Sequence, residues 1–392
     1  MGICRIGSAT FWTASAVSLL LVVASTGRAQ DAKAEDVVRA TKNHFETVTP
    51  ELGRYGRLTT YGETTSGTAI AKEALARERS LFNDALAAGL LKSPLREILA
   101  LGHNLIVHDP TAGLAYLKAL HASADLGNKD VAQAIVAATL ASGEQGEAMA
   151  VSELTSKDRD RRSFWAHYLE YYAIFLASAE PIQKHLADES ESAIKASLLR
   201  ALSMIGSPNS LAVVKDAVER ATDDDLQAAA IFSYTELGGY DGIAFLETIK
   251  PVGAQSSRER QESLSWLKAE TRPDSKHGRE VSNDSGFADR FGDLLSSPVI
   301  RWLKGRGLLE KDALKHSPRL DTDKKAELLD LLIDSRGFGL EAVKGSLYRN
   351  LSKEDEPRLL RIRAVSFYSP NAMSVARVKT IGLMIRRIRQ EL

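Results

Sequence analysis

Residues 203–214 read SMIGSPNSLAVV, and residues 235–246 read TELGGYDGIAFL. In each stretch an apolar run reaches a glycine, Gly206 or Gly238, then a short polar turn follows and a new apolar run begins. Helices commonly end at a glycine because glycine adopts the left-handed backbone conformation without strain. The two stretches therefore predict two successive units of helix, turn and helix.

Apolar residues around these turns repeat at helical spacing. Ile194, Leu198, Leu202 and Ile205 follow one another at intervals of three or four positions. This spacing places them on one face of a helix, which must be buried against a neighbour. Similar patterns fill the chain after Ala69, with few runs of β-branched residues. The sequence predicts an all-α protein.

Helix pairs that recur about every 30 to 40 residues are typical of stacked repeat proteins. The units over residues 193–267, with Asp223 before a helix that is rich in alanine and leucine and ends at glycine, resemble the HEAT family. A looser resemblance extends over residues 95–392. The resemblance to HEAT repeats implies a right-handed α-solenoid of stacked antiparallel helix pairs, and it carries no functional residues. Tetratricopeptide repeats are the alternative, because residues 109–127 and 143–158 begin 34 positions apart.

The first 29 residues have the pattern of a secretory signal peptide. A weakly basic start precedes an apolar core from Phe11 to Ala24, and small residues follow at Gly27 and Ala29. We expect cleavage after Ala29 and export to a bacterial periplasm or exterior; retention as a membrane anchor is the alternative. Cys4 is the only cysteine of the chain, so the cleaved protein would contain no disulfide.

Composition shifts divide the rest of the chain. A segment rich in Gly, Thr and Tyr precedes the helical repeats, and a polar stretch separates two groups of them. The expected divisions are a signal peptide (1–29), an N-terminal segment (30–68), HEAT-like repeats (69–270), a polar loop between repeats (271–297), and C-terminal repeats ending in a basic capping helix (298–392).

Charge and motifs exclude several function classes. The 51 Lys and Arg residues balance the 51 Asp and Glu residues, so no overall field favours nucleic acid. The sequence shows no nucleotide-binding loop, nucleophile elbow or zinc-protease motif, and we expect no cofactor. His103 and His108 are five positions apart, a spacing that turns them away from each other on a helix.

One alternative keeps an enzymatic role open. The polar loop carries His277 and Asp284, with Asp289 just beyond, and these side chains could converge. Long loops between regular elements are often functional. An enzyme or enzyme accessory with its site at residues 271–290 is therefore the alternative to a binding protein.

The stretch RDRRSFWAHYLEYYAIF, residues 159–175, is a candidate partner-binding surface. Aromatic and arginine side chains are enriched at the energetic centres of protein interfaces. The candidate residues are Arg161, Arg162, Trp165, Tyr168 and Tyr172. The alternative is an aromatic seam of the core beside a solvated basic turn.

The final helical segment carries an apolar stripe of Val378, Ile381, Ile385 and Ile388, with basic residues mostly beside it. Basic amphipathic helices can bind anionic lipid or polymer surfaces. The candidate contacts are Arg377, Lys379, Arg386, Arg387 and Arg389. The alternative is an amphipathic end cap of the solenoid, with cations near the helix C-terminus.

Together these features favour an exported, non-enzymatic scaffold or a module that binds a protein or peptide. Solenoids present long concave surfaces, which is an argument from fold rather than from an identified site.

Overall fold

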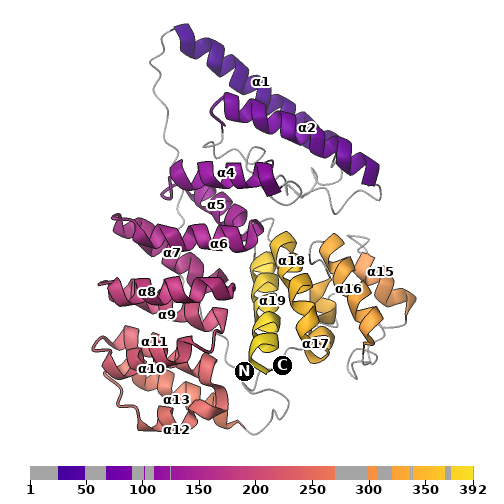
Figure 1. Cartoon of the computed structure of the whole chain (residues 1–392). Helices are drawn as coiled ribbons and strands as arrows, with labels where there is room; N and C mark the ends of the chain where they lie inside the picture. Colours follow the sequence, from indigo (N-terminus) through magenta and orange to yellow (C-terminus); the bar gives the residue numbers. More distant parts are fainter. Residues whose placement is uncertain are drawn as a thin grey trace.

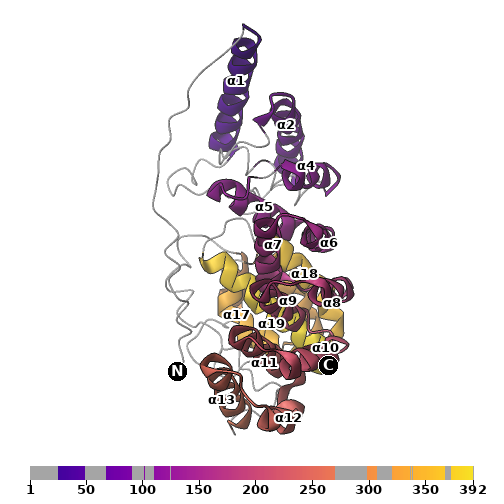
Figure 2. The same ribbon diagram turned by 90° about the vertical axis from the view of Figure 1, so that its left-hand side faces the viewer.

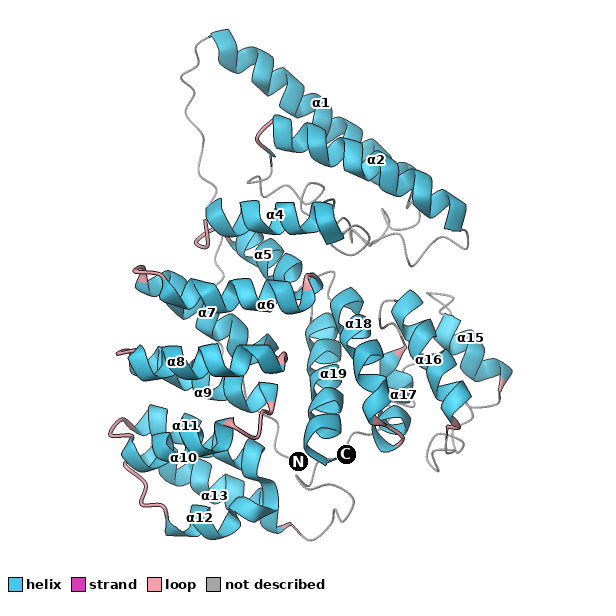
Figure 3. Ribbon diagram, in the orientation of Figure 1, coloured by secondary structure: helices cyan, strands magenta, loops and turns pink. Residues whose placement is uncertain are grey.

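The computed structural model describes residues 25–48, 68–90, 101, 110–123, 125–269, 298–306, 320–335, 337, 339–366 and 372–391 (Figure 1). All regular structure in these ranges is helical, and Figure 3 accordingly draws no strand there. The predicted all-α class is confirmed. The signal segment up to residue 24 and most of both polar loops, at residues 49–67 and 270–297, lie outside the described ranges.

Helices α4 to α13 lie above one another in a column (Figure 1). Seen from the side, α7, α9, α11 and α13 form one layer, and α6, α8, α10 and α12 form a second (Figure 2). The bounds are α4 (Pro110–Ser123), α5 (Lys129–Ala141), α6 (Gly143–Ser152), α7 (Arg159–Tyr172), α8 (Ala179–Asp188), α9 (Ser192–Ile205), α10 (Ser210–Arg220), α11 (Asp224–Gly238), α12 (Ile243–Thr248) and α13 (Ala254–Lys268), with short 3-10 turns η4 (Glu153–Thr155), η5 (Leu176–Ser178) and η6 (Gly239–Gly242).

The remaining helices flank this column. Two long helices, α1 and α2, pack against each other beyond α4, and the C-terminal helices lie beside the column, with α19 nearest to it (Figure 1). No helix in the described part of the chain has both the length and the apolar character that crossing a bilayer requires. The bounds are α1 (Ser25–Val48), α2 (Thr68–Ala87), α15 (Pro298–Gly305), α16 (Thr322–Asp334), α17 (Leu340–Arg349), η7 (Lys353–Asp355), α18 (Glu356–Ser366) and α19 (Ala372–Glu391).

Helix α9 forms as its sequence pattern predicts. Ile194, Leu198, Leu202 and Ile205 are all buried, because their shared face packs into the column. The helix ends at Gly206, whose φ of 73° lies in the left-handed region. Its backbone N–H donates to the carbonyl of Leu202, which closes the last turn.

Helix α11 begins as predicted and ends one residue later than expected. The side chain of Asp223 accepts a hydrogen bond from the N–H of Leu226 and so caps the helix N-terminus. Gly238 was the expected turning point, but it keeps a right-handed conformation and belongs to α11. The positive φ, 55°, falls on Gly239, where the chain leaves the helix.

The buried apolar residues form two clusters. One runs through the column and includes residues of α7, α9 and α11. The other joins α15 to α19 and takes in Ile174 from the loop after α7. The predicted apolar stripe of α19 is buried at Val378, Ile381, Ile385 and Ile388, with Val378 in the first cluster and the other three in the second. Helix α19 therefore joins the two cores.

Candidate functional site

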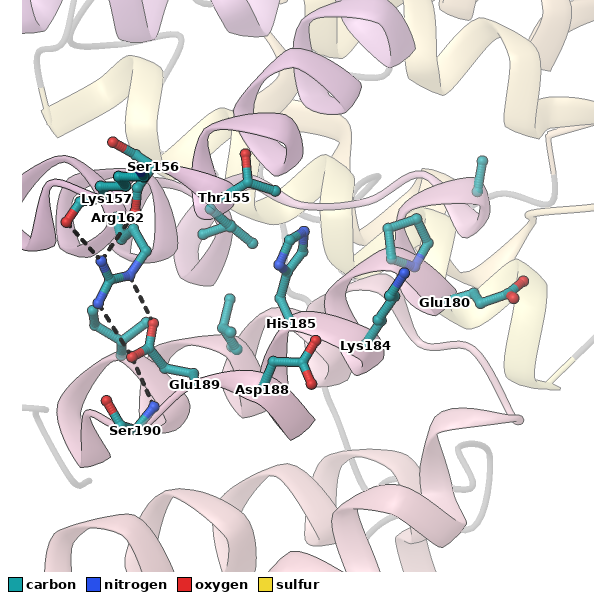
Figure 4. Close-up of a pocket in the computed structure, with 15 residues that line it drawn as sticks. Thr155, Ser156, Lys157, Arg162, Glu180, Lys184, His185, Asp188, Glu189 and Ser190 are labelled. Atoms are coloured by element: carbon teal, nitrogen blue, oxygen red, sulfur yellow. Dashed lines mark hydrogen bonds and ion pairs between the residues drawn. The ribbon is translucent and has the colours of Figure 1, made fainter.

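A groove of about 980 Å³ lies between the segment that joins α6 to α7 and helix α8 (Figure 4). It is open to solvent along the outer side of the column. Thr155, Ser156 and Lys157 line one side, and Glu180, Lys184, His185 and Asp188 of α8 line the other.

The groove combines an apolar floor with polar rims. Leu154, Ile194 and Leu198 contribute buried side chains to its lining. Lys157, Lys184 and Asp188 are exposed at its rims. Ligand sites are commonly built this way, since apolar surface supplies affinity and a few polar groups fix orientation.

Arg162 closes one end of the groove. Its Nε lies 3.0 Å from Oε2 of Glu189, and its Nη1 donates to the carbonyl oxygen of Ser156 at 3.0 Å. Glu189 also accepts from the N–H groups of Ser190 and Glu191, at 2.9 and 3.1 Å. Burial raises the pKa of Glu189, but these hydrogen bonds together hold it below its ordinary value. The pair of Arg162 and Glu189 thus links the first turn of α7 to the end of α8.

His185 is half-buried in the same groove. Burial is the main reason why its pKa is lowered, and Lys184 acts in the same direction against the opposing charge of Asp188. The imidazole is therefore neutral at pH 7, and one ring nitrogen can donate a hydrogen bond while the other accepts one. Such a group suits a peptide backbone, which presents both donors and acceptors.

A second groove of about 400 Å³ lies on the other side of α8. Gln183 and Leu186 of α8 line it together with Lys195 of α9 and Val213 of α10. Helix α8 thus forms a ridge between two grooves, each at a junction between successive helix pairs.

Only one residue of the predicted aromatic and arginine surface lines the larger groove, and it is Arg162. Trp165 has no exposed surface and Tyr168 retains only 4%, so both belong to the core. Tyr172 is half-buried and contacts the ring of Tyr168. Arg161 points to Glu153, with Nη2 2.9 Å from Oε1. Trp165 and Tyr168 thus match the core-seam alternative, whereas Arg161 and Arg162 are half-buried in ion pairs rather than solvated.

The predicted basic strip of α19 is also largely internal. Arg377 and Arg386 are only 2% and 5% exposed, which corrects the expectation that they face outward. Arg386 Nη1 lies 2.6 Å from Glu236 Oε2 of α11 and also donates to the carbonyl of Ser203 in α9. Arg377 Nε lies 2.8 Å from Glu341 Oε1.

The other basic residues of α19 are engaged too. Arg389 pairs with Glu356 at 2.6 Å and donates to the carbonyls of Ile174 and Ile205. Arg387 donates to the carbonyl of Tyr348 at 2.6 Å, and Lys379 lies over the ring of Tyr171. Carbonyls at helix C-termini lack intrahelical donors and attract cations, which explains why arginines face α9 here. These contacts leave little of the strip for an anionic surface.

The other sequence-based candidates fall in parts of the chain without a described structure. His103 and His108 lie outside the described residues, as do His277, Asp284 and Asp289 of the polar loop. Among the described residues no group of three or more His, Cys, Asp and Glu side chains could hold a metal ion.

Sequence reasoning missed the groove on α8. Glu180, Lys184 and Asp188 recur every four positions, which predicts an exposed helical stripe. That signal cannot show that a hollow lies beside the stripe, because the opposite wall comes from residues 154–157.

Comparisons with known proteins add no identification. No family model matches the chain, and no curated protein or solved structure matches it.

Proposed function

We propose that this chain is a non-enzymatic helical-repeat scaffold whose larger groove binds a peptide segment of a partner protein. The observation that carries the proposal is the open groove between α8 and residues 154–157, with its apolar floor and charged rims. A peptide fits this chemistry because its side chains can cover the floor while its backbone meets the hydroxyl, imidazole and charged groups.

The helix arrangement supports an α-solenoid of the HEAT-like kind. Helices α7, α9, α11 and α13 pack successively, each against the next, and each is accompanied by an outer helix. In such proteins successive pairs share one continuous core and leave grooves at their junctions. Export, with cleavage after Ala29, is part of the proposal and derives from the sequence of the first 29 residues.

Selection from a random peptide library tests the proposal directly. Peptides that bind the immobilised protein should lose affinity at least about tenfold when Lys184→Glu and Asp188→Lys are introduced together, because two of the exposed rim charges are reversed. The control is Lys353→Glu, which alters an exposed lysine of η7 away from the groove. Peptides that bind both variants equally well, or a library that yields no binder, would contradict the proposed function.

A further inference from the structure

Three exposed charged side chains follow one another along the rim that α8 gives to the larger groove (Figure 4). Glu180, Lys184 and Asp188 are four positions apart, so they lie on one side of the helix, and their charges alternate from negative to positive to negative. Because each helical residue rises about 1.5 Å, neighbouring members of this charge series are about 6 Å apart along the helix axis.

The charge series is available to a ligand. None of its three members makes an ion pair in the described part of the chain, and the same holds for the exposed Lys157 of the facing wall. By contrast, Arg162 and Glu189 neutralise each other at 3.0 Å. The groove therefore offers two positive and two negative charges that lack a partner of their own. Charge complementarity favours a ligand with both signs over a strongly acidic or strongly basic one.

Polar groups inside the groove favour an extended ligand over a helical one. Neither ring nitrogen of His185 makes a hydrogen bond among the described residues. Ser156 Oγ accepts from the N–H of Asp158 at 3.2 Å, and its own hydrogen has no acceptor there. A helix would cover these groups without offering partners, because its backbone groups are already paired, and this costs free energy. An extended backbone has N–H and C=O groups to offer.

The spacing of the charge series also matches an extended chain. Every second residue of such a chain points to the same side, and these residues are about 6.4 to 6.8 Å apart. Flexible side chains can cover the small difference from the spacing on α8. The intervening side chains point the opposite way, toward the apolar floor of Leu154, Ile194 and Leu198. Apolar and charged residues should therefore alternate in the ligand.

We infer that the larger groove binds an extended segment of a partner protein in which apolar residues alternate with a basic, an acidic and a basic residue. The three charged residues pair with Glu180, Lys184 and Asp188, and the apolar residues cover the floor. This order of charges reads the same from either end, so it does not depend on the direction of the peptide. The inference rests on the proposed function, because it names the class of peptide that the same groove selects.

Two seven-residue peptides, capped at both ends, test the order of the charges. One is Val-Lys-Val-Asp-Val-Lys-Val, and the other has the same composition in the order Val-Lys-Val-Lys-Val-Asp-Val. Fluorescence anisotropy with the full-length protein should give a Kd at least about fivefold lower for the first peptide, because only that order opposes unlike charges at all three positions. The difference should shrink in about 0.5 M salt, which screens exposed charges.

A reciprocal variant assigns the preference to α8. The triple variant Glu180→Lys, Lys184→Glu and Asp188→Lys inverts the charge series and breaks no ion pair of the described residues. It should bind Val-Asp-Val-Lys-Val-Asp-Val at least about tenfold more tightly than Val-Lys-Val-Asp-Val-Lys-Val, whereas wild type should show the opposite preference. Circular dichroism should show an unchanged helical spectrum, because all three side chains are exposed.

The matched control is Glu354→Lys, at an exposed position of η7 away from the groove. It changes the net charge of the protein by the same amount as the triple variant does. It should keep the wild-type preference between the two peptides, because the charge series itself is intact.

The same preference in wild type and triple variant would overturn the inferred pattern. So would tighter binding of a helix-forming peptide whose Lys, Asp and Lys are four positions apart, or groove-binding library peptides without this alternation. Peptides still bind in each of these cases, so the proposed function would stand. If neither the designed peptides nor any library peptide bound, the proposed function itself would be contradicted.

Discussion

The indole of Trp165 is surrounded by other rings. His121 stacks on it at 4.4 Å, and Phe164 and Tyr168 meet it edge-on at 5.1 and 5.4 Å. It has no exposed surface, and its Nε1 makes no hydrogen bond among the described contacts. Its contribution is therefore packing area and ring geometry rather than a polar contact.

Trp165→Ala should lower the free energy of unfolding by about 3 to 5 kcal/mol, because it removes a large side chain from a site that cannot fully collapse. Trp165→Phe should lower it less, since a ring remains and no hydrogen bond is lost. Urea denaturation followed by circular dichroism measures both. If Trp165→Ala were as stable as wild type, the residue would belong to a surface.

At the scale of a helix, the glycine that ends α9 is closely packed against side chains of α19, a distant part of the chain. Gly206 has a φ of 73°, and a Cβ built there would lie 3.0 Å from Cγ of Arg386 and 3.1 Å from Nε2 of Gln390. Gly89 has nearly the same φ, 70°, and a Cβ added to it would meet nothing within 4 Å. The two glycines thus have nearly the same positive φ and differ in how closely other atoms surround them.

Gly89→Ala should destabilise the protein by about 1 to 2 kcal/mol, the cost of a left-handed conformation for a residue with a Cβ. Gly206→Ala should destabilise the protein by roughly 1 to 3 kcal/mol more than Gly89→Ala does, because the new methyl group also crowds Arg386 of α19. Chemical denaturation of both variants measures the difference between their free energies of unfolding. If the two variants lost the same free energy of unfolding, α19 would accommodate the extra methyl group at no cost in stability.

Across the whole molecule, α19 and the column are joined by charged and polar contacts. Arg386→Met should lower the free energy of unfolding by about 3 to 5 kcal/mol, because Glu236 loses its guanidinium partner in a buried setting. The double variant Arg386→Met with Glu236→Leu should recover part of this loss.

The matched control is the exposed pair of Arg358 and Asp330, whose closest atoms are 2.9 Å apart. Arg358→Met should change stability by less than about 1 kcal/mol. Comparable effects at the two arginines would contradict the buried role of Arg386.

The sequence predicted individual helices better than the contacts that each helix makes with distant parts of the chain. Periodicity predicted α9, α10 and the start of α11, and it identified the buried stripe of α19, because these depend on residues a few positions apart. It placed Arg386 and Arg389 outside, since a periodic pattern does not show that helix C-termini from elsewhere offer carbonyl acceptors. The groove beside α8 could not be predicted from the sequence for the same reason, because its walls come from separate helix pairs.

The arginines of α19 also set an order of events in time. Arg386 follows its partner Glu236 by 150 residues, and Arg389 follows Ile174 by 215. At roughly 5 to 20 residues per second, a ribosome needs about 8 to 30 seconds to proceed from Glu236 to Arg386. Until then the carbonyls of Ser203 and Ile205, at the end of α9, lack their arginine donors. The end of α9 therefore acquires its full set of hydrogen bonds only after α19 has been synthesised.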